Sequence, residues 1–120
     1  MLDEFLFGRR IKPGQEVIIS GGYEFKSAWG EEEKRATVIK FFPGQGKTQA
    51  LLVEFKHPSP FVGFVAQYAV LELSYEDREW RDGATCRVEA CELIPEDKEW
   101  KDRVHGTAVE SHAIIRIAKK

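Results

Sequence analysis

The chain has 120 residues, 42% of them hydrophobic and 32% charged, which excludes a disordered polymer and is typical of a folded domain. Its formal net charge of −2 argues against general adhesion to a phosphate backbone, although a local basic patch remains compatible with it. No apolar run approaches the roughly 20 residues of a membrane-spanning helix, and the acidic start does not fit a secretory signal. We therefore expect one cytoplasmic domain spanning residues 1–120.

The two cysteines, Cys86 and Cys91, are too few for a disulfide framework. Their odd spacing places them on opposite faces of an uninterrupted strand, so we expect both thiols to be reduced. The histidines are scattered at positions 57, 105 and 112. A structural zinc site needs four ligands, so we expect neither a metal nor another cofactor.

Alternation of apolar and polar residues is the main local signal. Gly14 precedes a first short strand, in which Val17 and Ile19 share one face, and two glycines end it at positions 21 and 22. A polar insert, residues 22–35, then leads to a second strand over Thr37–Phe42, part of which we expect to be buried on both faces. The turn residues of Pro43–Gly46 predict a hairpin to a third strand over residues 51–56.

We expect the segment His57–Pro60 to end the third strand, because a proline has no amide hydrogen to donate. The following residues, 61–74, predict either two strands or one strand that is curved or bulged near Gln67. A short helix is the competing interpretation for this segment, because alanine, leucine, glutamate and glutamine favour helices.

The charged segment Tyr75–Gly83 ends in Asp-Gly, a strong turn signal. A further strand over residues 86–90 follows, with a bulge expected near Cys91. We expect one helical turn within residues 96–103 and a last strand over Ala113–Ala118. The total of five to seven short strands without a long helix predicts a mainly β fold: a small, closed or nearly closed barrel with a polar insertion.

The first third of the chain resembles the SH3-like barrels of the KOW and Tudor type. Those barrels open with a G-x-x-V-x-V-x-x-G strand and turn before a second strand with a V-x-V-like pattern, matched here by Gly14, Val17, Ile19, Gly22, Val38 and Lys40. The resemblance implies a small barrel that engages RNA, protein or a modified peptide through its loops. The chain departs from the KOW pattern where residues 22–35 replace a compact basic linker with a longer, acidic one.

Aromatic residues beside a run of carboxylates form the first candidate site. Ring faces and carboxylates together can hold a cationic side chain, and exposed aromatics also anchor protein partners. The leading expectation is therefore a non-catalytic interaction domain that binds a protein or a cationic peptide. The expected contact residues are Tyr23, Phe25, Trp29, Glu31, Glu32, Glu33 and Trp80. The alternative for the aromatic residues of the insert is structural: they fold back and cover one open end of the barrel.

Basic residues near both termini form the second candidate site. If the first and last strands pair, these residues lie in one patch that can bind nucleic acid. They are Arg9, Arg10, Lys12, Arg116, Lys119 and Lys120.

We expect no enzymatic activity. The neighbours Ser111 and His112 point apart on a strand, and no set of nucleophile, base and orienting group can be assembled from the sequence. The segment Gly44–Thr48 superficially resembles a phosphate-binding loop, but Phe41 stands where the first glycine of that motif is required.

Overall fold

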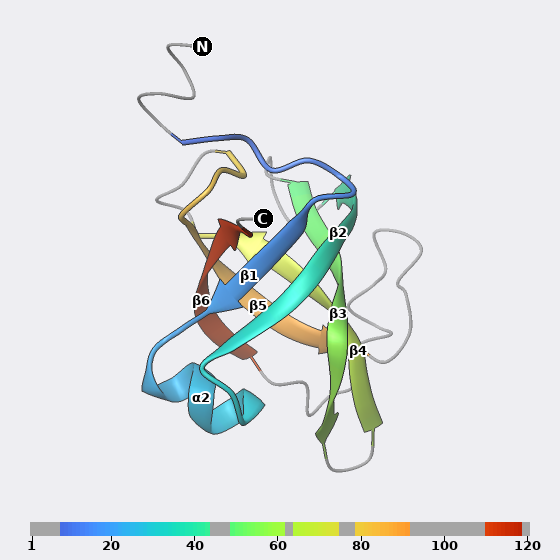
Figure 1. The fold of residues 1–120 in the computed structure, drawn as a ribbon, viewed down its shortest axis with the longest axis vertical. Coiled ribbons are helices and arrows are strands. Elements are labelled where there is room, and N and C mark those ends of the chain that lie inside the picture. The colour runs from blue at the N-terminus through green and yellow to red at the C-terminus, as the bar shows by residue number, and fades with distance from the viewer. Residues whose placement is uncertain (1–7, 44–48, 62–63, 75–78, 92–109, 119–120) are drawn as a thin grey trace.

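The computed structural model describes residues 8–43, 49–61, 64–74, 79–91 and 110–118. Within them, six antiparallel strands follow one another around a closed barrel, and one short helix lies at an end of the barrel (Figure 1). The elements are β1 (Glu16–Ser20), α2 (Tyr23–Trp29), β2 (Glu33–Pro43), β3 (Gln49–Phe61), β4 (Phe64–Leu73), β5 (Ala84–Cys91) and β6 (Glu110–Ile117). The predicted mainly β barrel of five to seven strands is confirmed.

The first strand closes the barrel by pairing with both β2 and the last strand, β6. Ile18 lies opposite Arg35 on one side and opposite Arg116 on the other. Each of the six strands thus has two neighbours, which removes the open edges at which sheets of different molecules tend to pair.

Alternate residues of each strand point into the barrel and form its core. In β1, Val17 and Ile19 are fully buried, whereas Glu16 is exposed and Ile18 between them is half-buried. Leu51 and Val53 of β3 fill the interior in the same way. Full burial of one such side chain stabilises the fold by about 1.5–3 kcal/mol, so this alternating set is the main source of stability.

A second, smaller apolar cluster lies on the other face of β3 and β4. It consists of Ala50, Leu52 and Val70, against which Ile39 and Tyr68 pack. Ile39 lies at an irregularity between β2 and β3, where the pairing shifts between Val38 and Lys40. Both faces of β3 and β4 are therefore buried here, whereas in the second strand, where burial on both faces was expected, the outward Ile39 is half-buried.

The prediction that Pro58 and Pro60 end the third strand is wrong. β3 continues to Phe61, and Pro60 pairs with Val65 of β4. The paired residues of β2 reach only as far as Phe55 of β3, so among the described residues the proline segment borders β4 alone. A proline is tolerated on such a border because its missing amide costs no bond on the side without a neighbour.

The segment after this hairpin is a single strand, β4, so the helical interpretation is wrong. Hydrogen bonding to β3 and β5 on both sides outweighs the modest helical preference of its residues. Opposite Gln67 the pairing with β3 shifts between Glu54 and Ser59, close to where the irregularity was expected.

The last two strands follow the prediction, with β6 starting three residues earlier than expected. Cys86 lies in the core and is not in a disulfide. The turn before β5 contains Gly83 at a φ of 91°, and the amide of Ala84 donates to the carbonyl oxygen of Arg81 over 2.9 Å. The expected helical turn within residues 96–103 lies outside the described residues.

Candidate functional site

The helix α2 seals the lower end of the barrel, the end at the bottom of Figure 1. Phe25 and Trp29 point inward and are only 1% and 4% exposed. Their rings stack with centroids 5.8 Å apart, and Trp29 meets the Phe55 ring edge-on at 5.2 Å. The prediction that Phe25 and Trp29 contact a partner is therefore corrected: they cover the barrel end, as the structural alternative had it. Their ring surface is stabilised more by the apolar core than by water.

The polar insert was expected to be a loop, but its first part forms the helix α2, and the local sequence explains why. Phe25 and Trp29 are four residues apart, which places both on one helical face. Gly30 ends the helix at a φ of 77°, where its amide donates to the carbonyl oxygen of Lys26 over 2.8 Å. This spacing of aromatics before a glycine was the available signal for a helix.

Two carboxylates of the predicted acidic site are engaged in ion pairs within the molecule. Glu31 Oε2 lies 2.9 Å from Lys34 Nζ, and Glu32 Oε1 lies 3.5 Å from Lys26 Nζ. Lys34 is itself 3% exposed; its Nζ donates to the carbonyl oxygen of His57 over 2.6 Å and lies 5.1 Å from the centroid of the Phe55 ring. Glu31 and Glu32 are therefore already paired with lysines of the same molecule.

Glu31 and Glu32 are exposed but paired, and two further residues of the predicted partner site are exposed without an ion pair among the described residues. Tyr23, the first residue of α2, is 86% exposed. Glu33, the first residue of β2, is also exposed and has no ion pair among the described residues. The structure thus removes the large buried rings from this site and leaves one tyrosine and one free carboxylate.

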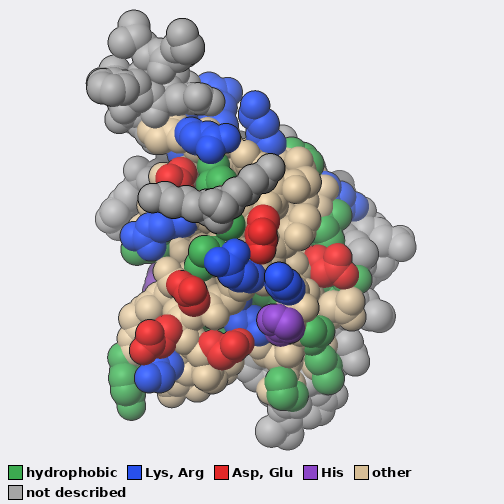
Figure 2. Space-filling view, in the orientation of Figure 1, with side chains coloured by type: hydrophobic (Ala, Val, Ile, Leu, Met, Phe, Trp, Pro, Cys, Tyr) green, Lys and Arg blue, Asp and Glu red, His purple; other side chains and the backbone are tan. Residues whose placement is uncertain are grey.

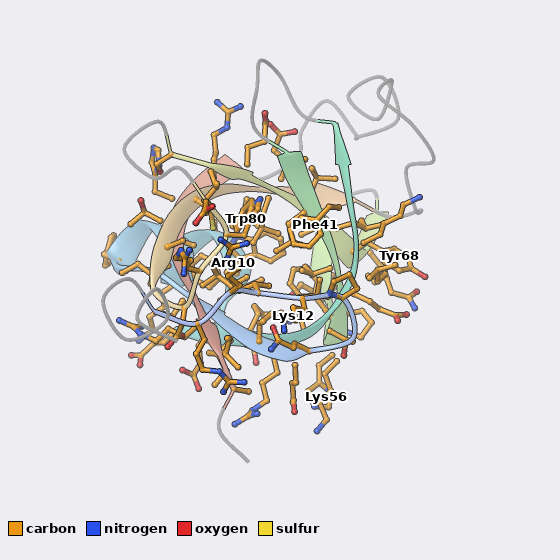
Figure 3. The ribbon with its side chains drawn as sticks, turned by 90° about the horizontal axis from the view of Figure 1, so that it is seen from above. Arg10, Lys12, Phe41, Lys56, Tyr68 and Trp80 are labelled. Atoms are coloured by element: carbon orange, nitrogen blue, oxygen red, sulfur yellow. The ribbon has the colours of Figure 1, made fainter. Side chains whose placement is uncertain are left out.

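Residues 79–82 lie at the upper end of the barrel, the end at the top of Figure 1, and Trp80 among them is only 7% exposed. The amide of Ile11 donates to the carbonyl oxygen of Trp80 over 3.0 Å, so the N-terminal segment is held beside this residue. Viewed from above, Trp80, Phe41 and Arg10 lie within the ring of strands (Figure 3). The expectation that Trp80 meets a partner is corrected, because the same apolar surface is used to close the barrel.

A buried arginine fixes the upper end. Arg81 donates through Nε to Glu79 over 2.9 Å and through Nη1 to the carbonyl oxygen of Gly8 over 2.9 Å. Glu79 also pairs with Arg10, whose Nη2 lies 3.5 Å from Glu79 Oε1. The charge of Arg10 is therefore partly neutralised, whereas Arg9 and Lys12 have no ion pair among the described residues.

Pairing of β1 with β6 brings the predicted basic residues of the two ends of the chain into one region. Arg9, Lys12 and Arg116 are exposed, and none of them has an ion pair among the described residues. Arg9 lines a cleft of about 740 Å³, which Ile117, the residue after Arg116, also lines. Glu16 and Asp82 line the same cleft, so its charge is mixed. Lys119 and Lys120 lie outside the described residues.

Two basic residues that the sequence had not singled out, Arg35 and Lys56, lie on the outer surface of the same side of the barrel. Arg35 is opposite Ile18 in the pairing of β1 with β2. Lys56 is exposed and follows Phe55, which pairs with Ala36. Only the register between strands reveals that they lie near Arg116, so no signal local to the sequence points to them.

No family model, no curated protein and no solved structure matches this chain. In the part of the chain that the structure describes, no helix is long and apolar enough to cross a membrane. The same residues contain no group of three or more histidine, cysteine, aspartate and glutamate side chains arranged to hold a metal ion. What the structure establishes, within the residues it describes, is a small antiparallel barrel of six strands.

Proposed function

We propose that this protein is a non-catalytic domain that binds the phosphate backbone of a nucleic acid. The observation that carries the proposal is the set of exposed cations without an ion pair among the described residues: Arg9, Lys12, Lys56 and Arg116. Lysine and arginine side chains that are free to replace counterions provide the main attraction to a polyphosphate. Two of the four, Arg9 and Lys12, precede β1, and the other two lie on β3 and β6, so the barrel exposes free cations despite its overall charge of −2.

The filled interior favours binding on the outer surface over chemistry in a cavity. Phe25 and Trp29 occupy the lower end of the barrel, and Ile11 and Trp80 occupy the upper end. Small-molecule enzymes usually hold their substrates in a concave pocket lined with converging polar groups. In this barrel the corresponding interior space is occupied by packed side chains.

The likeness of the first third of the chain to KOW and Tudor barrels supports the same ligand class and forms part of this proposal. Three of the residues that carry that likeness, Val17 and Ile19 of β1 and Val38 of β2, are buried in the core of the barrel. The likeness implies binding through loops, and Arg9 and Lys12 lie in the segment that precedes β1.

Binding can be measured by fluorescence anisotropy with labelled 20-nucleotide DNA and RNA, as single strands and as duplexes, between 25 and 200 mM salt. We expect binding that weakens as salt rises, with a slope of log K against log salt of about −2 to −4 for three or four phosphate contacts. The double variant Arg9→Gln/Lys12→Gln should bind at least tenfold more weakly at 25 mM salt. Lys26→Gln, which removes a cation paired with Glu32 on the helix, is the matched control.

Failure to bind any of these probes at 50 μM protein and 25 mM salt would overturn the proposal. Equal binding by the double variant and the parent would show that Arg9 and Lys12 play no part and would leave the proposal to Lys56 and Arg116.

A second candidate function, binding of a protein or a cationic peptide, rests on Tyr23 and Glu33. An 86% exposed tyrosine is unusual for an apolar ring, and Glu33 supplies an unpaired carboxylate in the same insert. A partner that is captured from lysate by the parent and lost with Tyr23→Ala would support this function, while capture at equal yield by both would exclude the tyrosine.

A further inference from the structure

The outer surface of the barrel carries a line of basic residues across four strands. From β6 to β3, the register places Arg116 opposite Ile18 and Ile18 opposite Arg35. Lys56 continues the line: Ala36 pairs with Phe55, and because β2 and β3 are antiparallel, the residue before Ala36, Arg35, lies beside the residue after Phe55, Lys56. Figure 2 shows Lys and Arg side chains in such a line across this side of the molecule, with Asp and Glu side chains on both sides of it.

The two ends of this line, Arg116 and Lys56, are exposed cations without an ion pair among the described residues. Arg35 between them pairs with Glu16 over 3.2 Å. Neighbouring strands lie about 4.8 Å apart, so three intervals place Arg116 and Lys56 about 14 Å apart along the sheet. That separation is close to the roughly 12 Å width of the major groove of a double helix, which has one phosphate backbone on each side.

The four positions of this line that the structure describes, Arg116, Ile18, Arg35 and Lys56, include no aromatic ring on which a base of a single strand could stack. Proteins that bind single strands combine a basic groove with exposed rings on which the bases stack. The rings of Phe25, Trp29 and Trp80 are sealed inside the barrel. Tyr68 lies outside the barrel but packs against Ala50, Leu52 and Val70, and it points in a different direction from Lys56 (Figure 3).

We infer that the nucleic acid this barrel binds is double-stranded and lies across the outer faces of β6, β1, β2 and β3. Arg116 and Lys56 contact the phosphates on the two sides of one groove, and the half-buried Ile18 between them permits close approach. The rigid, hydrogen-bonded strands hold the two cations at a fixed separation, which suits a duplex of regular width better than a flexible strand. This inference rests on the proposed function and specifies its ligand.

The test compares a 20-base-pair duplex with each of its own single strands at 50, 100 and 150 mM salt, by anisotropy. We expect the parent protein to bind the duplex at least tenfold more tightly than either strand at each salt concentration. Lys56→Gln and Arg116→Gln should each weaken duplex binding and reduce the magnitude of its salt slope by about 0.9, the value for one lost phosphate contact. Lys26→Gln should leave both quantities unchanged.

Equal or tighter binding of a single strand by the parent protein would overturn the inference while leaving the proposed function intact. A salt slope unchanged in both Lys56→Gln and Arg116→Gln would also overturn it, provided that thermal melting shows both variants folded. Binding of neither form would remove the proposed function itself. The comparison of duplex with single strand uses the parent protein alone, so it is decisive even if a variant fails to fold.

Discussion

At the scale of single residues, the large aromatics of this chain close the barrel instead of meeting a partner. Trp29 touches both Phe25 and Phe55, and Trp80 lies beside the N-terminal segment. Their ring area is too large to leave in water when an open barrel end lies within reach. Aromatic residues in a connection therefore do not by themselves mark a binding site; their burial decides.

Truncation of the ring at the lower end should be costly. We expect Trp29→Ala to lower the free energy of unfolding by about 3–5 kcal/mol, because it removes a buried ring and leaves a cavity between Phe25 and Phe55. Urea denaturation followed by circular dichroism measures the change. Tyr23→Ala is the control on the same helix and should stay within about 0.5 kcal/mol of the parent, because that ring is exposed. A loss below 1 kcal/mol for Trp29→Ala would contradict the sealed end.

At the scale of elements, the connection from β1 to the helix depends on a close approach of backbone at Gly21. A Cβ atom at this position would lie 2.5 Å from Phe25 Cβ and 2.8 Å from the carbonyl oxygen of His112. The next residue, Gly22, has open space around its own Cβ position and begins the helix without a side-chain cap. The two adjacent glycines thus have different physical roles.

Substitution of these two glycines should separate the roles. We expect Gly21→Ala to destabilise the protein by about 1–3 kcal/mol, because overpacking forces α2 away from the barrel end. Gly22→Ser should be neutral or stabilising by a few tenths of a kcal/mol, because serine can cap the first turn of the helix. Thermal and urea denaturation of both variants provide the measurement. Equal stability of the two variants would show that the helix does not depend on the close approach.

The strands were largely predictable, whereas the helix and the proline segment were not. Alternation of apolar and polar residues located β1, β3, β5 and β6, since one side of each strand is buried. Residues 22–30 were interpreted as a loop, because polar and charged residues surround the two rings that turn inward, Phe25 and Trp29. Pro58 and Pro60 read as breakers, because whether a strand has a neighbour on its amide side is a property of the sheet and not of the strand.

At the scale of the whole molecule, pairing of the first and last strands makes the barrel closed. Ile19 of β1 contacts strand partners on both sides, Lys34 of β2 and Ile115 of β6. A closed barrel has no terminal strand that frays separately, so the six strands should behave as one cooperative unit.

Hydrogen exchange tests closure directly. We expect the amides of Val17, Ile18 and Ile19 to exchange as slowly as those of Leu51–Val53 in β3, because β1 is bordered on both sides. In an open sheet the outward amides of β1 would exchange at least a hundredfold faster than those of β3. Exchange monitored by two-dimensional NMR distinguishes the two results, and fast exchange confined to β1 would contradict the closed topology.

The candidate site was less predictable than the fold. Arg9, Lys12 and Arg116 were identified as a set that depends on pairing of the two ends of the chain, and β1 and β6 do pair. Arg35 and Lys56 were missed, because they join the set only through the register between strands. Both lie far from Arg116 in the sequence, so no local pattern connects them. Long-range register follows from closure, not from any short motif.

The sequence by itself determined that the chain forms a small β barrel, because a two-residue period of apolar side chains has few other ways to bury its surface. It also placed one group of basic residues, Arg9 to Lys12, near the start of the chain and Arg116 near its end. Only the tertiary structure decided which way Phe25, Trp29 and Trp80 face and which charges are already paired. Those outcomes depend on which strands become neighbours. An aromatic ring can cover a barrel end only after the strands have closed into a barrel.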